Sequence, residues 1–466
     1  MALHHIPFFS QTLSLTFTSK PKLNNNNKNR FSFFTPSLSS TALMATSNKV
    51  LLPIAEGTEP MEAVIIADVL RRAGADVIVA SVSASLSVLA RHDVKIIADA
   101  LVSDVVGTSF DLVAIPGGIP GVENLRDCKV LEALVKKHVE EGRLYAAVCA
   151  APAVVLGPWG LLNGLKVRFA LQSTLLCCVA GGDGCGDSVC VVVGQATCFP
   201  TLIEKLASYA ATTVESRVQV DGKLVTSRAP GTTMEFAVAL VEQLMGKVKA
   251  EEVAGPLVMR SKHDEEHTFK EFNPVQWTFD NPPRILVPIA YGFEEMEAVI
   301  IIDILRRAKA NVVVASVEDY LEIVASRNVK LVADMLLDEA AKLSYELIVL
   351  PGGLGGAQAF GNSETLVKLL EKQRESNKYY GAICASPALV LERHGLLKGK
   401  KATAYPAMCD RLSDQSEVEN RVVVDGNLIT SRGPGTSIEF ALAIVEKLFG
   451  RQLALELAKA VVFARP

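Results

Sequence analysis

The chain has 466 residues, 49% of them apolar and 21% charged, which is typical of a globular protein of two or three domains. A formal net charge of -4 over this length argues against nucleic acid or a membrane surface as the main partner. No apolar run reaches the roughly 20 residues of a membrane-spanning helix. The nine cysteines form neither a disulfide framework nor a standard zinc motif. We expect a soluble protein in a reducing compartment, without metal or other cofactor.

Residues 1–48 contain no aspartate or glutamate, carry four lysine or arginine residues and are rich in serine and threonine. This composition is typical of an organellar transit peptide, and the segment lacks the long apolar core of a secretory signal. We predict targeting to the chloroplast, with the mitochondrion as the second choice. The alternatives are a disordered tail and a shorter cytosolic form that starts at Met44.

An internal repeat begins at Val50, where a buried strand, a turn, an amphipathic helix and a second strand follow one another. The same order recurs from Ile285, and a later stretch from Val220 matches one from Val424. Alternating strands and helices predict a mostly parallel sheet with helices on both faces. We therefore expect two tandem α/β domains, at 49–259 and 284–466, joined by a charged, aperiodic linker at 260–283.

Residues 167–195 have no counterpart in the second unit and contain four of the nine cysteines around a glycine-rich centre. A zinc or redox loop is one interpretation, but the spacings fit no standard site. We favour an in-frame retained intron, because Val167 and Arg168 can be encoded by GTAAGA, a splice donor, and Gln195 by CAG, an acceptor end. This segment is expected to be poorly ordered, and the absence of a shorter transcript would refute the hypothesis.

A single cysteine ends a buried apolar run in each unit: Cys149 in LYAAVCAAP and Cys384 in YYGAICASP. Small residues and a proline follow, which predicts a sharp turn from strand into helix. The free amides at the start of the helix would face the thiol, lower its pKa and favour the nucleophilic thiolate. The alternative is an ordinary buried cysteine, but the duplication of the motif favours chemistry.

Two further segments of each unit converge with the cysteine at the carboxyl edge of such a sheet. One offers Glu62 or Glu297 at the start of a helix, where a protonated carboxyl could hydrogen-bond a thiolate and shuttle a proton. The other is IPGG or LPGG, whose amides could bind an oxyanion. The alternatives are a charge that complements the helix dipole and a tight turn. Because the whole set occurs twice in register, we predict a site.

These motifs, EGTEPMEAV, IPGG, AAVCAAP and TSRAPGT with their second-unit partners, resemble those of the ThiJ/PfpI family over nearly both units. The similarity is to the branch of the parkinsonism-associated protein deglycase, and to its plastid-directed tandem members in plants. The resemblance implies two flavodoxin-like three-layer sandwiches, of the class I glutamine-amidotransferase-like type. It implies a pseudo-dimer of the two units, because the family usually forms homodimers, and a further homo-oligomer is an open alternative.

The resemblance also implies roles for individual residues. It pairs Cys149 with Glu62 and Cys384 with Glu297 as catalytic groups. The amides that it assigns to an oxyanion or to substrate are those of Gly118, Ala150, Gly353 and Ala385. Where the family has a histidine this chain has Phe199 and Tyr405, and the family arginine, expected to bind substrate, is Arg327 in the second unit but His92 in the first. Since only Tyr405 could replace part of a proton shuttle, Cys384 is expected to be the more active.

Two functions therefore stay open. The first is a glutathione-independent glyoxalase that converts methylglyoxal or glyoxal to lactate or glycolate, or a related protein deglycase, acting on small reactive carbonyls. The second is a redox-sensing stress protein or holdase chaperone with client proteins and little turnover. The cysteine, glutamate and glycine set, preserved in both units, favours the enzyme, and the missing histidine favours the sensor.

Overall fold

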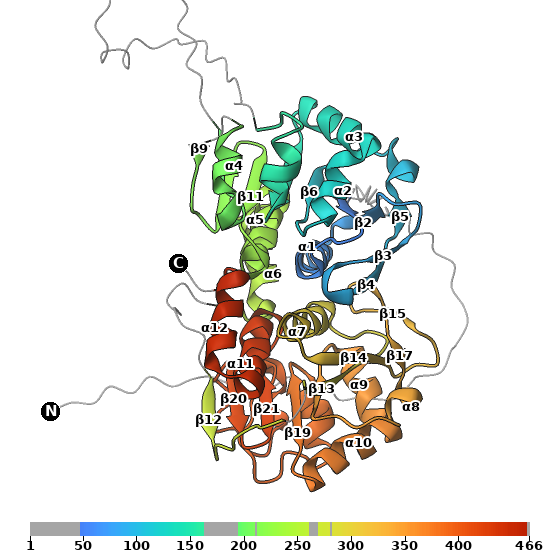
Figure 1. The fold of residues 1–466 in the computed structure, drawn as a ribbon, viewed down its shortest axis with the longest axis vertical. Helices are drawn as coiled ribbons and strands as arrows, with labels where there is room; N and C mark the ends of the chain where they lie inside the picture. Colours follow the sequence, from blue (N-terminus) through green and yellow to red (C-terminus); the bar gives the residue numbers. More distant parts are fainter. Residues whose placement is uncertain (1–46, 163–193, 210–211, 261–268, 280–281, 464–466) are drawn as a thin grey trace, which may run out of the picture. The chain divides into compact units, whose positions relative to one another are not determined.

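The computed structural model describes residues 47–162, 194–209, 212–260, 269–279 and 282–463 (Figure 1). The predicted transit peptide and most of the segment 167–195 lie outside these residues. Within the described ranges, no helix is long and apolar enough to cross a membrane.

The first repeat is built on a sheet that has seven strands in the part of the chain the structure describes. Across the sheet they are β10 (Val218–Asp221), β11 (Leu224–Ser227), β7 (Leu144–Val148), β6 (Leu112–Ile115), β1 (Lys49–Ile54), β2 (Asp76–Ser81) and β5 (Ala100–Leu101). All neighbours are parallel except β10 and β11. The central strands read as continuous apolar runs because helices cover both faces.

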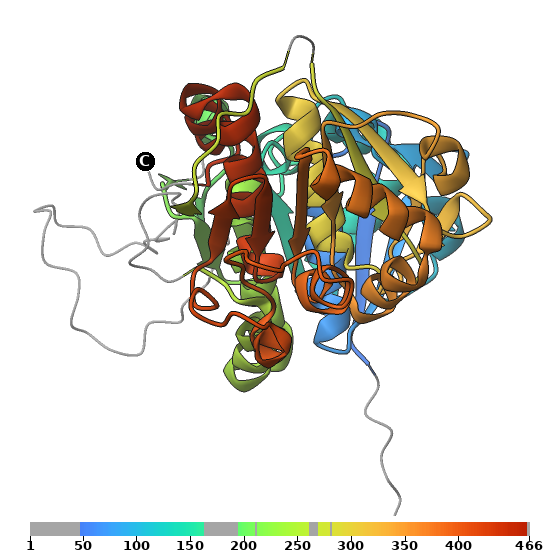
Figure 2. The same cartoon turned by 90° about the horizontal axis from the view of Figure 1, so that it is seen from below.

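The second repeat has the same sheet with one strand added at its edge. Across the sheet the strands are β12 (Lys270–Phe272), β20 (Val422–Asp425), β21 (Leu428–Ser431), β19 (Tyr379–Ile383), β18 (Leu347–Leu350), β13 (Arg284–Ile289), β14 (Asn311–Ser316) and β17 (Met335–Leu336). Only β20 and β21 pair antiparallel. Strand β12 comes from the expected linker, whose Trp277 also stacks on Tyr379 with 3.7 Å between ring centroids. Figure 2 shows helices on both sides of this sheet.

Most helices recur in matching positions in the two repeats. In the first they are α1 (Pro60–Arg72), α2 (Gly121–Asp127), α3 (Lys129–Glu140), α4 (Ile203–Ala207), α5 (Thr233–Met245) and α6 (Lys247–Ala254). In the second they are α7 (Glu295–Arg307), α8 (Leu337–Ala340), α9 (Leu354–Asn362), α10 (Glu364–Glu375), α11 (Ser437–Phe449) and α12 (Arg451–Ala460). The exceptions are α4 and α8, which correspond to 3-10 segments of the other repeat. The expectation of two mostly parallel, flavodoxin-like α/β folds is confirmed.

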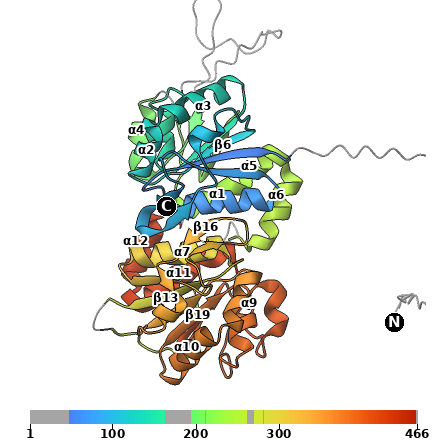
Figure 3. The same ribbon diagram turned by 90° about the vertical axis from the view of Figure 1, so that its right-hand side faces the viewer.

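The two repeats meet along α1 and α7, which pack against each other (Figures 1 and 3). Each helix has an acidic residue in its first turn and two arginines in its last turn, which complements its dipole. A small sheet also joins the repeats: β3 (Ser87–Leu89) and β4 (Lys95–Ile97) continue into β16 (Lys330–Val332) and β15 (Glu322–Val324). A single cluster of buried apolar side chains contains residues of both repeats, such as Ile65 and Ile300. The repeats therefore share one core across their contact.

Candidate active site

Each candidate cysteine lies one residue beyond the end of a buried parallel strand, β7 or β19. Cys149 has a φ of 62° and Cys384 a φ of 65°, in the left-handed region that a residue with a Cβ adopts at a cost of about 1–3 kcal/mol. The π-helical segments η3 (Pro152–Leu156) and η7 (Pro387–Glu392) follow. The predicted turn from strand into helix is present in both repeats.

Backbone hydrogen bonds hold this strained turn from two sides. The Cys149 amide donates to the Ser227 carbonyl at 3.0 Å, and its carbonyl accepts from the Phe199 amide at 2.8 Å. Cys384 has the matching bonds to Ser431 at 3.0 Å and Tyr405 at 2.7 Å. The strain persists because neighbouring segments fix both ends of the peptide. The half-buried thiols are thereby aimed at the carboxyl edge of the sheet.

A fully buried glutamate hydrogen-bonds each thiol: Glu62 bonds Cys149, and Glu297 bonds Cys384. The first glycine of IPGG or LPGG holds the carboxyl group. The Gly117 amide donates to Oε2 of Glu62 at 2.7 Å, and the Gly352 amide donates to Oε2 of Glu297 at 2.7 Å. The other oxygen of each carboxyl, Oε1, is buried and has no hydrogen-bond partner among the residues that the structure describes.

The glycine that holds the glutamate cannot carry a side chain. A Cβ on Gly117 would lie 2.6 Å from the Cys149 Cβ and 2.8 Å from Glu62 Oε2. The same atom on Gly352 would lie 2.6 Å from the Cys384 Cβ. The sequence predicted a role for the second glycine of each pair, and it missed this role of the first. The two consecutive glycines of IPGG and LPGG were the sequence feature that could have indicated this role.

The pKa values of the thiol and the carboxyl are both raised. Burial, and then the charge of Glu59, raise the pKa of Glu62 to about 8, and burial and Glu294 raise that of Glu297 well above its usual range. Burial, and then the nearby glutamates, also raise the thiol pKa of Cys149 and of Cys384. This corrects the expected low thiol pKa, because burial beside carboxylates outweighs the helix amides. A thiolate is favoured only where the glutamate keeps its own proton and donates it.

Backbone amides do reach both sulfur atoms, but from different segments. The Ala150 amide hydrogen-bonds the thiol of Cys149, and the Gly353 amide that of Cys384; each bond lowers the thiol pKa. Gly118 and Gly353 share a positive φ, of 94° and 83°. Ala385, like Ala150, is buried directly after its cysteine. Of the four amides predicted for an oxyanion, those of Ala150 and Gly353 therefore reach a thiol.

The glutamate three residues before Glu62 or Glu297 forms an ion pair with the opposite repeat. Glu59 pairs with Arg307 at 2.7 Å, and Glu294 pairs with Arg72 at 2.6 Å. These arginines also lower the pKa of Glu62 and of Glu297 in the opposite repeat. Each site thus receives the positive charge of an arginine from the other repeat. The sequence analysis missed both pairs, although LRRA recurs at the end of each helix.

The residues that replace the family histidine lie beside the thiols, as their backbone bonds to the cysteines show. The hydroxyl of Tyr405 donates to the Pro256 carbonyl of the first repeat at 3.2 Å. Arg327 lies in the contact between the repeats, where its amide donates to Glu295 and its guanidinium to the Ser326 carbonyl. His92, its counterpart, lies 2.7 Å from Asp303 of the second repeat.

Among the described residues, one group of three carboxylates is dense enough to hold a cation: Asp68, Glu294 and Glu295 lie within 4.8 Å of one another. The guanidinium of Arg72 pairs with two of them. An arginine is therefore their cationic partner in this structure.

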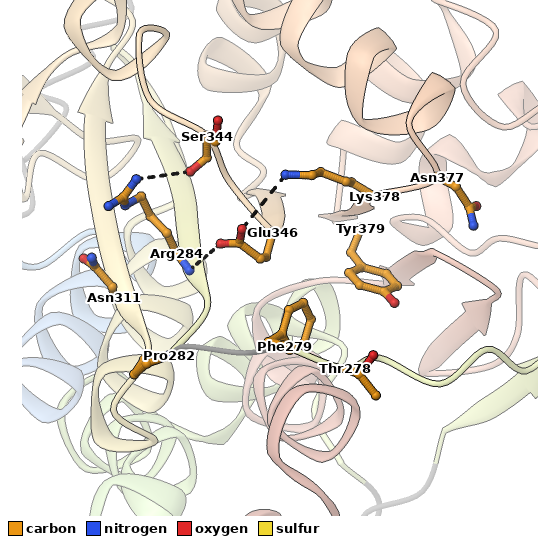
Figure 4. Close-up of a pocket in the computed structure, with 10 residues that line it drawn as sticks. All are labelled: Thr278, Phe279, Pro282, Arg284, Asn311, Ser344, Glu346, Asn377, Lys378 and Tyr379. Carbon is orange, nitrogen blue, oxygen red and sulfur yellow. Dashed lines mark hydrogen bonds and ion pairs between the residues drawn. The ribbon is translucent and has the colours of Figure 1, made fainter.

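A separate cavity of about 570 Å³ lies at the opposite, amino-terminal edge of the second sheet (Figure 4). It is lined by charged and aromatic side chains, among them Phe279, Arg284, Glu346, Lys378 and Tyr379. Glu346 accepts from the Arg284 amide at 2.8 Å and lies 4.0 Å from the Lys378 amine. The Arg284 guanidinium donates to the Ser344 carbonyl, and this cavity lies away from the thiol.

The structure has two tandem α/β folds, and each of them carries a cysteine on a strained turn against a buried glutamate. These two features define the class to which the protein belongs. The family model of the DJ-1/PfpI family matches residues 48–192, 190–243 and 283–447, and the chain belongs to this family.

The relatives support the tandem arrangement. Protein DJ-1 homolog B of Arabidopsis thaliana is 58% identical over 98% of both chains, and homolog A is 55% identical over 90% of this chain and 100% of its own. A Caenorhabditis elegans protein named glutathione-independent glyoxalase DJR-1.2 is 30% identical over 45% of this chain and 95% of its own. The solved Drosophila melanogaster DJ-1beta is 33% identical and covers 46% of this chain and 100% of its own, with a TM-score of 0.39.

Proposed function

We propose that the chain is a glutathione-independent glyoxalase that acts on methylglyoxal and glyoxal through its two cysteine–glutamate pairs. The observation that supports this most is the buried carboxyl of Glu62 or Glu297, bonded to a thiol, with its Oε1 unpartnered. With a pKa of about 8, Glu62 keeps its proton at neutral pH and can pass it to a substrate oxygen. The similarity to a named glyoxalase agrees with this chemistry.

The reaction would begin when the thiol adds across the aldehyde C=O of methylglyoxal. Sulfur bonds to carbon, and the proton passes to oxygen through Glu297, which gives a hemithioacetal. The carboxyl then carries the C1 proton to C2 while the hydroxyl proton moves from O1 to O2, so the adduct becomes a lactate thioester. Water cleaves the thioester and releases lactate and the thiol. No step needs an external oxidant or reductant.

Lactate production from methylglyoxal by the pure protein tests this proposal. We expect Cys384→Ala to remove most of the activity and Cys149→Ala a smaller part, because Phe199 has no hydroxyl. The double variant should be inactive. Cys128→Ala serves as the control, because Cys128 is a partly exposed cysteine that does not lie on a turn from strand into helix. Absence of lactate, or unchanged activity in the double variant, would contradict the proposal.

A second candidate function is redox sensing, and the position of the Tyr405 hydroxyl favours it. That hydroxyl donates to the Pro256 carbonyl, so it is committed to the contact between repeats, and Phe199 offers no proton at all. Hydrogen peroxide would oxidise the thiolate to sulfenate and then to sulfinate, releasing one water for each oxygen transferred. The neutral glutamate and the backbone amides would stabilise the sulfinate.

Peptide mass spectrometry after mild peroxide treatment distinguishes this function. If the sites are sensors, Cys149 and Cys384 should form sulfinate at least tenfold faster than Cys128 and Cys409. Equal rates at all four cysteines would exclude sensing, whatever the result of the lactate assay.

We also propose that residues 1–48 direct the protein to the chloroplast, on the basis of their acid-free, serine-rich composition. Fusion of these residues to a fluorescent protein tests the proposal in plant cells. Mitochondrial or cytosolic fluorescence would contradict it.

A further inference from the structure

A segment near the end of each repeat lies against the other repeat, beside the loop that follows β11 or β21. In the first repeat this terminal segment is 257–259, and a Cβ on Gly435 of the second repeat would lie 2.6 Å from the Val258 carbonyl oxygen. In the second repeat it is 461–463, and the Gly231 amide of the first repeat donates to the Val461 carbonyl at 2.8 Å. Each repeat therefore receives the terminal segment of the other.

A strained valine lies in the middle of each terminal segment. Val258 has a φ of 57°, and Val462, at the equivalent position of the second repeat, has a φ of 54°. A β-branched residue with a positive φ is a genuine outlier. Because such a conformation persists only where its surroundings fix the backbone, both segments depend on contacts that hold them in place.

Arg217 connects the terminal segment of the second repeat to the turn at Cys149. Its guanidinium donates to the Gly231 carbonyl of its own repeat at 2.5 Å and to the Val462 carbonyl at 3.1 Å. The carbonyl of Arg217 accepts from the Ser227 hydroxyl at 2.7 Å. The carbonyl of Ser227 in turn accepts the amide of Cys149 at 3.0 Å. Hydrogen bonds of Arg217 and Ser227 thus link the opposite repeat to the strained cysteine.

Arg421 makes the same connection between the first repeat and the turn at Cys384. Its guanidinium donates to the Gly435 carbonyl of its own repeat at 2.7 Å and to the Val258 carbonyl at 3.1 Å. The carbonyl of Arg421 accepts from the Ser431 hydroxyl at 2.8 Å, and the carbonyl of Ser431 accepts the amide of Cys384 at 3.0 Å. The arrangement therefore occurs twice, once beside each thiol.

We propose that Arg217 and Arg421 are positioning residues of the two sites. Each one holds the terminal segment of the opposite repeat against the loop that fixes the cysteine turn of its own repeat. Loss of this hold loosens the turn and lets solvent and reagents reach the thiol. The inference rests on the proposed role of the two cysteines, but it concerns how their turns are held and not turnover.

Each arginine also pairs with a glutamate of its own repeat, so charge and hold must be separated. Arg217 lies 2.7 Å from Glu235, and Arg421 lies 2.7 Å from Glu439. Lysine keeps the positive charge for the glutamate. It lacks the planar fork that lets one guanidinium donate to the carbonyl groups of two different segments. Arg→Lys is therefore the selective variant at both positions.

The test measures alkylation of Cys149 and Cys384 by iodoacetamide at a fixed pH in the intact chain, with each peptide quantified by mass spectrometry. We expect Arg217→Lys to speed alkylation of Cys149 about tenfold, as for a local opening made easier by the loss of hydrogen bonds from a charged group. Cys384 should keep its original rate in this variant. Arg421→Lys should have the reciprocal effect. A general loss of stability would instead expose both cysteines, because the repeats share one core.

A chain shortened by residues 461–466 tests the other side of the same contact, because it lacks the carbonyl groups that the first repeat holds. We expect it to speed alkylation of Cys149 about tenfold and to leave Cys384 at its original rate. Arg374→Lys is the matched control, since the Arg374 guanidinium donates to the Gly395 carbonyl of its own repeat at 2.8 Å. It should change neither rate.

The proposal is overturned if Arg217→Lys or Arg421→Lys leaves the cysteine of its own repeat at the original rate. It is also overturned if either variant, or the shortened chain, speeds both cysteines equally. Alkylation needs no turnover, so a protein without glyoxalase activity would still give the expected rates. Failure of the proposed function is therefore a separate result.

Discussion

At the scale of single residues, each site depends on the close approach of three backbone segments. The cysteine has a positive φ, the glutamate is buried against it, and a glycine amide fixes the carboxyl from the third segment. Gly352 tolerates no side chain, because a Cβ there would lie 2.6 Å from both Glu297 Oε2 and the Cys384 Cβ. Any side chain at this position must separate the thiol from the carboxyl.

We predict that Gly352→Ala lowers activity at Cys384 at least tenfold and destabilises the fold by about 1–3 kcal/mol, the usual range for overpacking. Lactate production in a Cys149→Ala background and urea unfolding measure the two effects. Gly107→Ala is the matched control, since a Cβ there meets nothing within 4 Å. Equal activity of the two glycine variants would show that the backbone relaxes and that the contact is not critical.

At the scale of elements, the charged residues at the ends of α1 and α7 have two effects. Their buried carboxylates and arginines hold the repeats together, and they set the charge beside each thiol. Buried ion pairs of this kind carry a large desolvation cost. Glu295 adds to that cost when it ionises, because Arg72 already pairs with Asp68 and Glu294.

The stability of the protein should therefore depend on pH through Glu295. Its pKa is raised from 4.5 to about 7, so the folded state binds the proton more tightly than the unfolded state. Stability from this group is full below about pH 4.5 and is lost as pH rises to about 7. Relative to the original chain, Glu295→Gln should gain up to about 3 kcal/mol between pH 4.5 and pH 8. Urea unfolding across this range measures the gain, and a pH-independent difference would contradict it.

At the scale of the whole molecule, the two repeats pack into one compact unit. They share the buried cluster along α1 and α7 and the strand pairing of β4 with β16. Each site takes an arginine contact from the other repeat. If one repeat were separated from the other, the face of α1 or α7 that is now buried between them would be exposed.

We predict that both repeats unfold in a single transition. The chain has two tryptophans, and the buried Trp159 reports on the first repeat while the buried Trp277 reports on the second. Fluorescence of Trp277→Phe and Trp159→Phe should give urea midpoints that agree within about 0.3 M, as expected for two-state unfolding. Two separate midpoints would show that the repeats fold independently.

Features that depend on local pattern and on duplication could be predicted from the sequence. Apolar runs, turn residues and their recurrence predicted two mostly parallel α/β folds, the turns at Cys149 and Cys384, and the grouping of Glu62 and Glu297 with them. These predictions depend on periodicity and on the geometry at the end of a strand, which are short-range properties of the chain.

Properties that depend on the distance between segments far apart in the sequence appear only in the packed structure. The raised thiol pKa follows from burial beside carboxylates, which no spacing reveals. The pairing of Glu59 with Arg307, and of Glu294 with Arg72, arises only when α1 packs on α7. The charge of Glu295 is visible in the sequence, but the rise of its pKa needs the packed contact, since Coulomb energy depends on separation and on the loss of water.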